Sequence, residues 1–406
     1  VVLRKLFERL GSTYIKLGQF IASSPSLFPD EYVLEFQKLL DKAEPVPWDD
    51  IRAIIESELK APYTQVFASI DPKPLATASV AQVHSAVLKA SNKEVVIKVL
   101  KPGVEDVLTT DMTAVLLASR YMELLAPELS RLSLAAIVGD IRTTMEEEVD
   151  FRKEALHLQE FATFLDMRNL RGVATCPFVY KQLSSQRVLT MEKLNGVSLT
   201  DYAAIRSITS KDPEAVLVSA LNTWFASVLG APTFHADVHA GNLLVLANGT
   251  VGFIDFGIVG RIDPVTWKAV EALIAGLATA DYETMARALA TIGACDTDVD
   301  YKKFGRDLET FFTEMESVQT NVTLTNDGVR GPLSASLEVD QTQLNRLFLN
   351  LIRIGETHGV KFPRQFGLLV KQLLYFDRYI QLLAPSLKVF TDDRINVRDL
   401  SRQMTI

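Results

Sequence analysis

The sequence predicts an α+β fold, in which a small β-containing part is followed by a larger, mostly helical part. Residues 95–99 read Val-Val-Ile-Lys-Val, a short β-branched run that is typical of a strand. Residues 242–258 hold two apolar runs separated by Asn248-Gly249, which is the pattern of a β-hairpin. Most of the other residues after Ser198 have the character of helices.

The order of the elements follows from the same patterns. Residues 1–60 are expected to be helical, because leucines recur at helical spacing near the start and residues 32–40 form a second amphipathic segment. Residues 64–100 are expected to carry strands. Residues 104–166 are helical in character and become acidic towards their end.

Further strands are expected at residues 177–180 and 187–191, and Asn195-Gly196 indicates a turn or linker. We therefore predict two lobes joined near residue 193, preceded by a helical extension. A cleft at such a junction is a favoured place for a ligand. The predicted units are residues 1–60, 61–193 and 194–406.

The composition is that of a soluble globular protein. The chain has 406 residues, of which 48% are hydrophobic, and its net charge of −8 argues against a nucleic-acid partner. Cys176 and Cys295 lie far apart and form no Cys-x-x-Cys pair, so neither a zinc site nor a disulfide framework is expected. No apolar stretch is long enough to span a bilayer, so any membrane contact is expected to be peripheral or to lie outside this sequence. Since the chain begins with Val1, we expect a processed form or an excised segment.

Four segments supply, in order, the parts that phosphoryl transfer from ATP requires: positioned phosphates, neutralised charge and an oriented nucleophile. Lys98 ends a Val-Val-Ile-Lys strand and could pair the α and β phosphates. Taken alone, so short a motif favours a solvated lysine on an edge strand. Residues 146–155 are expected on one helix, which could aim Glu154 at Lys98. The alternative is an ordinary acidic face exposed to solvent.

The third segment, residues 234–242, reads Phe-His-Ala-Asp-Val-His-Ala-Gly-Asn. Asp237 and Asn242 have the spacing of the catalytic loop of protein kinases, where the aspartate orients the proton of the nucleophile and the asparagine binds magnesium. His235 and His239 are four residues apart and could instead form a zinc pair. No third ligand follows nearby, which favours the first interpretation.

The fourth segment is Asp255-Phe256-Gly257, whose aspartate would hold the metal that bridges the phosphates. Hard oxygen ligands without His or Cys favour Mg²⁺. Between the two lobes, backbone groups of Glu192 and Leu194 could meet an adenine edge. This last inference depends on position along the chain alone.

A conventional kinase would have a Gly-rich loop before Lys98, but residues 74–84 contain none, and no Ala-Pro-Glu segment follows Asp255. In these departures, and in its N-terminal Lys16-Leu17-Gly18-Gln19, the sequence resembles the UbiB family of atypical kinase-like proteins, also described as aarF-domain-containing kinases. The resemblance extends to further signatures of that family. They are an Ala-rich loop, here Ala76, Thr77, Ala78 and Ser79, and a Glu-x-Asp signature, here Glu148-Val149-Asp150.

This resemblance implies a bilobal kinase-like fold whose N-terminal extension lies over the active site. Lys98, Glu154 and Asp237 would be catalytic, and the Ala-rich loop would set the preference for ATP or ADP. Lys16, Gln19, Glu148 and Asp150 would block peptide substrates from the cleft. Val238 and Ala240 replace prolines that are usual in the family, which leaves the details of the subgroup open.

Members of the family support the synthesis or homeostasis of prenylquinones and associate with membranes. The resemblance therefore implies a Mg²⁺-dependent ATPase or small-molecule kinase, with a prenyl lipid or quinone precursor as a partner. A protein serine/threonine kinase and a non-catalytic, nucleotide-gated lipid-binding scaffold are the alternatives. Residues 235–242, 253–261, 361–364 and 371–379 are similar to a branch found in plant and algal chloroplasts. This similarity implies the chloroplast envelope or plastoglobule, with the mitochondrion as the alternative.

Overall fold

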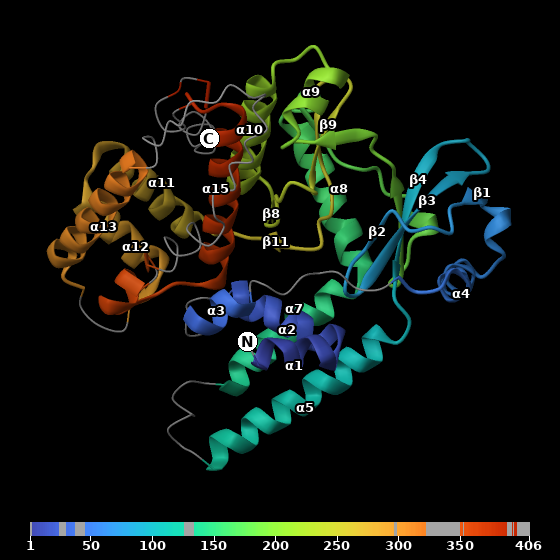
Figure 1. Ribbon diagram of the computed structural model, residues 1–406, viewed down its shortest axis with the longest axis horizontal. Coiled ribbons are helices and arrows are strands. Elements are labelled where there is room, and N and C mark those ends of the chain that lie inside the picture. The colour runs from blue at the N-terminus through green and yellow to red at the C-terminus, as the bar shows by residue number, and fades with distance from the viewer. Residues whose placement is uncertain are drawn as a thin grey trace, which may run out of the picture.

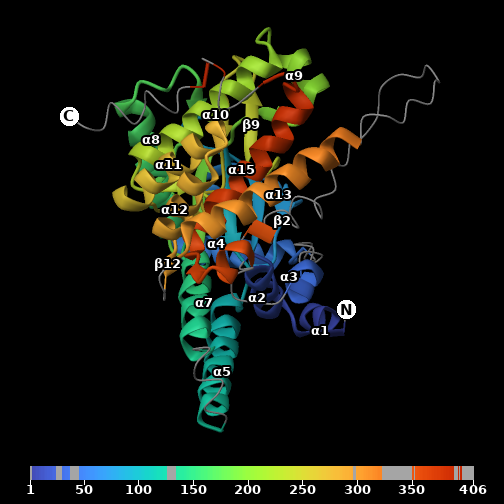
Figure 2. The same cartoon turned by 90° about the vertical axis from the view of Figure 1, so that its left-hand side faces the viewer.

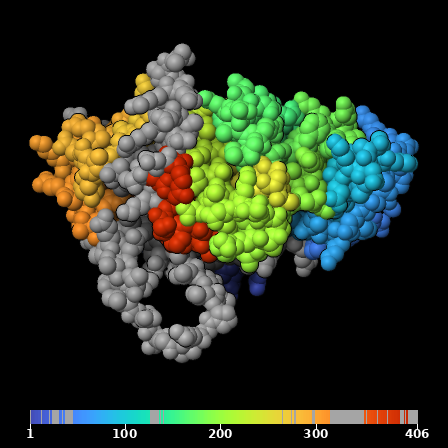
Figure 3. Space-filling model, turned by 90° about the horizontal axis from the view of Figure 1, so that it is seen from above, coloured from blue at the N-terminus to red at the C-terminus, as the bar shows by residue number. Residues whose placement is uncertain are grey.

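The computed structural model describes residues 2–23, 30–36, 45–125, 134–295, 299–321, 350–351, 353–387, 392 and 394–395. Helices predominate and the sheets are small, so the predicted α+β fold is confirmed (Figure 1). The main sheet lies at one end of the molecule and the helices of residues 264–321 lie at the other, a separation that is also visible from above (Figure 3).

The main sheet is antiparallel and places Lys98. Its strands are, in order, β1 (Phe67–Ile70), β3 (Ala81–Leu88), β4 (Glu94–Leu100) and β6 (Val188–Glu192), with the short β2 (Ala76–Thr77) paired to β3. Alternate residues of β4, among them Ile97, are fully buried in one apolar cluster with helix α4 (Trp48–Leu59). Because side chains alternate across a strand, Lys98 lies on the opposite face of the sheet.

A group of helices lies beneath this sheet in Figure 1. Figure 2 shows α5 and α7 side by side, projecting from the rest of the molecule. Helix α2 contacts both of them, so the start of the chain packs against the segment that follows β4. The bounds are α1 (Val2–Leu10), α2 (Ser12–Ser23), α3 (Asp30–Phe36), α5 (Val104–Leu125), α7 (Leu134–Glu148) and α8 (Phe151–Met167).

One helix was expected over residues 146–155, and this expectation was wrong. Helix α7 ends at Glu148 and α8 begins at Phe151. Asp150 lies between them with extended backbone, and its Oδ1 accepts a hydrogen bond from the backbone N–H of Arg152 at 3.1 Å. An aspartate in this position satisfies an otherwise unpaired N–H at the start of a helix, which is why the chain breaks here.

The second sheet contains the predicted hairpin. Strands β9 (Leu243–Leu246) and β10 (Val251–Phe253) pair antiparallel, and the turn places Gly249 at φ +74°, a conformation that glycine adopts without strain. The outer strands are β7 (Gly196–Ser198), beside β9, and β5 (Ala174–Thr175), beside β10. The strand expected at residues 177–180 is absent from this described stretch, where Val179 forms an isolated bridge to Met191.

The helical part also contains short strands that the sequence did not predict. Strand β8 (Phe234–His235) pairs with β11 (Val259–Gly260), and β12 (Ala294–Cys295) pairs with β13 (Val360–Lys361). Two-residue strands carry no periodicity, so no pattern could have revealed them. The β8–β11 pair holds residues 235–242 against residues 255–260, which brings two of the predicted site segments together.

Most of helix α10 is buried, as expected for a helix with few polar residues. Its Trp224 is fully buried and donates its indole N–H to the carbonyl oxygen of His235 at 2.9 Å. The helices here are α9 (Tyr202–Ile208), α10 (Pro213–Gly230), α11 (Pro264–Thr279), α12 (Tyr282–Ile292), α13 (Tyr301–Asn321) and α15 (Arg364–Leu383). Among the described residues, no helix is long and apolar enough to cross a bilayer. The boundaries at residues 60 and 193 stay predictions.

Candidate active site

Lys98, Glu154 and Asp255 meet at one point, although they come from three distant segments. The Lys98 Nζ atom lies 2.9 Å from Oε2 of Glu154 and 3.0 Å from Oδ1 of Asp255. Glu154 stands in the first turn of α8, so the helix start defined by Asp150 also fixes the direction of its side chain. The structure therefore brings together the lysine and two of the acidic residues that the sequence singled out.

The charges of this triad are strongly coupled. Burial raises the pKa of Glu154 to about 7, although Lys98 opposes the shift. Burial would also raise the pKa of Asp255, but the Lys98 ammonium outweighs it and brings that pKa to about 2. The two carboxylates in turn overcome the effect of burial on Lys98, whose pKa is raised. Lys98 thus stays charged and holds Asp255 in its ionised form.

Asp255 is held in an unusual backbone conformation. Its φ is +60°, in the left-handed region that residues with a side chain rarely adopt. Phe256 next to it is fully buried, with its ring centroid 4.9 Å from that of Phe161 and 4.6 Å from that of His235. The Asp255 side chain is nevertheless 47% exposed, so the strained turn leaves its carboxylate accessible beside Lys98.

His235 has a structural position and not that of a metal ligand. It is fully buried, its Nε2 lies 2.8 Å from the carbonyl oxygen of Ile254, and its Nδ1 accepts the backbone N–H of Asp237 at 3.1 Å. These partners require the tautomer with the proton on Nε2. Burial lowers the pKa of His235, which keeps the ring neutral. Among the residues that the structure describes, no group of three or more His, Cys, Asp or Glu is placed to hold a metal.

Asn242 is joined to Asp237 within the same loop. Its side-chain Nδ2 donates to the backbone oxygen of Asp237 at 2.9 Å, and its own backbone oxygen accepts from Ile254 at 3.0 Å. Since the amide nitrogen is used, the amide oxygen is the atom that remains as a metal ligand. Asp255 and Asn242 therefore offer two hard oxygens. This set fits Mg²⁺, which proteins usually bind through one or two side chains together with substrate phosphates.

Helix α15 contacts the same loop through residues that sequence reasoning did not place in the site. Lys371 Nζ lies 3.2 Å from Oδ1 of Asp237. Gln372 accepts the N–H of Val238 at 2.9 Å and donates to the carbonyl oxygen of Ala236 at 2.7 Å. The hydroxyl of Tyr379 donates to the carbonyl oxygen of Val238 at 2.8 Å. The sequence signal was the similarity of residues 371–379 to a known branch, which included these residues but assigned them no role.

The residues proposed to contact the nucleotide lie along the edge of the main sheet. Ala76 and Thr77 form β2, and the turn after them is closed by a hydrogen bond from Ala78 N to Ala81 O at 2.9 Å, with Ser79 buried beside it. This turn occupies the place of a Gly-rich loop. The roles of Ala76, Ala78 and Ser79 stay predictions.

Backbone hydrogen bonds hold the segment that links the two lobes. Glu192 ends β6, and its backbone N–H donates to Phe178 O at 2.8 Å. The N–H of Lys193 donates to Glu94 O at 3.3 Å. The Leu194 side chain lies against Gly252, where an added Cβ would meet its Cδ1 at 2.9 Å. The proposed contacts of Glu192 and Leu194 with adenine also stay predictions.

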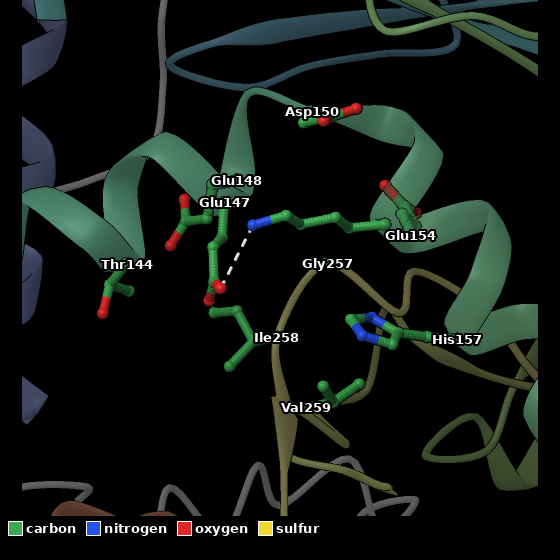
Figure 4. A pocket seen from close by; sticks show the side chains of 10 residues that line it. Thr144, Glu147, Glu148, Asp150, Glu154, His157, Gly257, Ile258 and Val259 are labelled. Carbon is green, nitrogen blue, oxygen red and sulfur yellow. Dashed lines mark hydrogen bonds and ion pairs between the residues drawn. The ribbon is translucent and has the colours of Figure 1, made fainter. Parts of the chain in front are cut away.

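A pocket of about 70 Å³ lies beside the triad, between α7, α8 and residues 257–259 (Figure 4). Glu148 lines it and forms an ion pair with Lys16 of α2, with a distance of 2.7 Å between Nζ and Oε2. Of the four residues predicted to block peptides, these two are brought together. Gln19 is half-buried one turn further along α2. Asp150 lines the pocket but forms an ion pair with Arg152 at 2.7 Å, and its carboxylate points away from Glu148.

Comparison with known proteins places this site in a family. Residues 38–289 match the ABC1 atypical kinase-like domain. An uncharacterised aarF domain-containing protein kinase of Arabidopsis thaliana, described as chloroplastic, is 53% identical over 405 residues, which cover 98% of this chain and 75% of the relative. An uncharacterised protein of Mycobacterium tuberculosis is 34% identical over 394 residues, with 97% of this chain and 76% of the relative covered.

The more distant relatives include proteins that are also described as kinases. A probable protein kinase UbiB of Shewanella baltica is 29% identical over 394 residues, covering 96% of this chain and 67% of the relative. Among solved structures, a Mycobacterium tuberculosis protein in complex with erythromycin has a similar fold, with a TM-score of 0.50 and 20% identity. The similarity covers 86% of this chain and 89% of that one. The chain therefore belongs to the ABC1 atypical kinase-like family, which includes the UbiB and aarF proteins that its sequence resembles.

Proposed function

We propose that this protein binds ATP with Mg²⁺ and transfers the terminal phosphoryl group to water or to a small molecule. The observation that carries the proposal is the position of Lys98 between Glu154 and Asp255, at 2.9 and 3.0 Å. In a phosphoryl-transfer site, such a lysine is held by one carboxylate and pairs the α and β phosphates, while the other carboxylate holds the metal. A cluster of this kind, in which the charged Lys98 and Glu154 side chains are buried, would be costly to maintain for stability alone.

The residues of this chain divide the work in a definite way. Lys98 orients the nucleotide, and Asp255 with Asn242 would hold Mg²⁺, which neutralises phosphate charge when it is bound. Asp237 accepts the proton of the attacking hydroxyl or water. Two hydrogen bonds fix the backbone of Asp237 on either side, since its N–H donates to His235 and its carbonyl oxygen accepts from Asn242. The base is thus oriented before substrate arrives.

Three observations support a place in prenyl-lipid metabolism in the chloroplast. The UbiB relatives carry a name that refers to ubiquinone biosynthesis. The Arabidopsis relative is described as chloroplastic. The ion pair of Lys16 with Glu148 fastens α2 beside the pocket that Glu154 also lines, which would favour a small acceptor over a peptide. We propose a peripheral position at the envelope or plastoglobule. A fluorescent fusion of the complete protein distinguishes this location from the mitochondrion.

A protein serine/threonine kinase is the second candidate, because the Shewanella relatives are described as probable protein kinases. Radiolabelled ATP with an organelle extract separates the two proposals. Labelled protein that disappears in Asp237→Asn supports the second candidate. Turnover of ATP without labelled protein supports the first. Nucleotide binding without turnover, with and without liposomes that contain prenylquinone precursors, supports a nucleotide-gated scaffold instead.

The primary test is the unfolding temperature with and without Mg-ATP. We expect Mg-ATP to raise it in the wild type and to have little effect in Asp255→Asn, because that variant loses the charge that holds the metal. Asp106→Asn is a matched control, since Asp106 is exposed on α5. A wild-type protein that shows no shift with Mg-ATP contradicts the proposal.

A further inference from the structure

The loop that carries Asp237 has no permanent cation of its own. Residues 235–242 include two histidines but no lysine or arginine. His239 Nε2 lies 3.6 Å from Oδ2 of Asp237, but His239 is 44% exposed and is charged only when protonated. A phosphoryl group that arrives beside Asp237 brings negative charge next to a carboxylate. Some positive charge must offset this repulsion for the transfer to proceed.

Lys371 supplies a positive charge at this place from a distant part of the chain. It lies 134 residues after Asp237, and its Nζ approaches Oδ1 of the carboxylate to 3.2 Å. Its side chain is 37% exposed, so the ammonium reaches the accessible side of the loop. An ammonium has three N–H donors pointing in different directions, so it can contact Asp237 and a phosphoryl oxygen at the same time.

The Lys371 side chain stays protonated. Burial lowers the pKa of this lysine, but the Asp237 carboxylate and Tyr375 outweigh that effect and leave the pKa raised. The ring of Tyr375 lies 5.7 Å from Nζ, which adds a favourable contact between the cation and the aromatic face. Lys371 therefore remains an ammonium throughout the physiological range.

Other residues of α15 hold the backbone of the loop, so Lys371 is not needed for that purpose. Gln372 bonds to Val238 N and Ala236 O, and Tyr379 bonds to Val238 O. These three hydrogen bonds are buried and fix the peptides on both sides of Asp237. What Lys371 adds is a positive charge beside the carboxylate of Asp237.

Lys98 belongs to a separate cluster of charges. Lys98 contacts two carboxylates, those of Glu154 and Asp255, so its charge is more than balanced locally. Lys371 contacts one carboxylate, and the pair carries no net charge. A phosphoryl group therefore meets less repulsion beside Lys371 than beside Asp237 alone.

We propose that Lys371 is the cation that faces the transferred phosphoryl group, and that it also positions the Asp237 carboxylate towards the acceptor. The inference rests on the proposed function. In the step, an oxygen of water forms a bond to the γ-phosphorus, and the bond from that phosphorus to the β–γ bridging oxygen breaks. The electron pair of the broken bond leaves with ADP. One proton of the water passes to Asp237, and the product is inorganic phosphate.

The test compares the affinities of Mg-ATP and Mg-ADP in Lys371→Met, which keeps the length of the side chain and removes its charge. We expect the affinity for Mg-ATP to fall about tenfold or more, because a charge-assisted contact to the terminal phosphate is lost. The affinity for Mg-ADP, which lacks that phosphate, changes less than about twofold. Turnover of bound ATP falls by about 10²-fold.

Two further variants complete the experiment. Lys371→Arg keeps the charge and is expected to recover the discrimination between ATP and ADP. Lys303→Met removes a lysine that is exposed on α13, and its affinities are expected to match the wild type. The unfolding temperature without nucleotide is recorded for each variant, because a purely structural lysine would lower it and would weaken both nucleotides equally.

The possible failures are distinguishable. Equal losses for ATP and ADP in Lys371→Met, or no loss for either, overturn the role of Lys371 while the proposed function stands on the wild-type binding. A wild-type protein that binds neither nucleotide overturns the proposed function and this inference together.

Discussion

Lys16 of α2 and Glu148 at the end of α7 form an ion pair, with Nζ 2.7 Å from Oε2. Both side chains are largely buried, at 16% and 19% exposure, so water and salt screen the pair only in part. Glu148 also lines the pocket beside Glu154. The pair thus fastens the first helices of the chain to one wall of the candidate active site.

We expect Lys16→Met to destabilise the protein by about 1 to 3 kcal/mol, because it leaves the carboxylate of Glu148 without its partner in a partly buried place. The double variant Lys16→Met/Glu148→Gln should recover part of this loss. The free energy of unfolding in denaturant is the measurement, and Lys5→Met on the exposed side of α1 is the control. A coupling energy near zero between the two substitutions contradicts the ion pair.

The raised pKa of Glu154 predicts a specific pH dependence of stability. The pKa is about 7 in the folded protein and 4.5 in the unfolded chain, so the folded state binds more protons in this window. Stability from this residue is therefore present below pH 4.5 and is lost as the pH rises to about 7. The lowered pKa of Asp255 has the opposite sign and acts below its unfolded value of 3.8, in a separate window.

Glu154→Gln removes the titration and keeps an amide that can accept from Lys98. The free energy of unfolding of the wild type should fall relative to that of Glu154→Gln as the pH rises from 4.5 to 7. We expect this relative change to be at least about 1 kcal/mol. Chemical denaturation across this range measures it. Glu309→Gln, at an exposed position of α13, is the control, and its plot of unfolding free energy against pH should run parallel to that of the wild type. A plot for Glu154→Gln that also runs parallel to the wild type would contradict the raised pKa of Glu154.

Asp237→Asn should separate chemistry from binding. Asp237 is held by Lys371 and the loop and is not one of the two proposed metal ligands, so its amide variant should still bind Mg-ATP. Loss of the base should lower the turnover by about 10²- to 10⁴-fold. The measurement is steady-state phosphate release together with the nucleotide-dependent unfolding temperature. A variant that also fails to bind Mg-ATP would show that Asp237 acts in binding.

Trp224→Phe should destabilise the protein by about 1 to 3 kcal/mol, because the buried carbonyl oxygen of His235 loses its donor and the smaller ring leaves space. The indole N–H lies 2.9 Å from that oxygen in the wild type. Thermal and denaturant unfolding measure the loss. Trp267→Phe on α11 is a useful comparison, because its indole bonds to the side chain of Glu271 in a less buried place. Equal losses of unfolding free energy in the two variants would contradict a stabilising hydrogen bond from Trp224 to His235.

Local patterns predicted the parts of the site that each depend on one segment. The β-branched run around Lys98 identified its strand, and alternation within that strand determines the face on which the lysine lies. Asn248-Gly249 identified the hairpin that spaces Asn242 from Asp255. The break at Asp150 could also have been found, since an aspartate followed by a helical segment is a common helix start.

The contacts between distant segments could not be predicted in this way. No local pattern around Lys371 distinguishes it from a solvated lysine on a helix, and its role depends on the packing of α15 against the loop of Asp237. The pairing of β8 with β11 likewise depends on tertiary contacts, because two residues carry no periodic signal. The resemblance to a family indicated that these segments belong together, but it did not indicate which atoms meet.

The dependence of this loop on α15 has a consequence for biosynthesis. Gln372 and Tyr379 complete hydrogen bonds to residues made 134 to 141 positions earlier. At 5 to 20 residues per second, a ribosome needs roughly 7 to 27 s to add that length of chain. During this interval the nascent loop has Asp237 but neither the hydrogen bonds from α15 nor Lys371. The proposed phosphate-facing site is therefore complete only after α15 has been made, and chains that terminate before Arg364 should be inert.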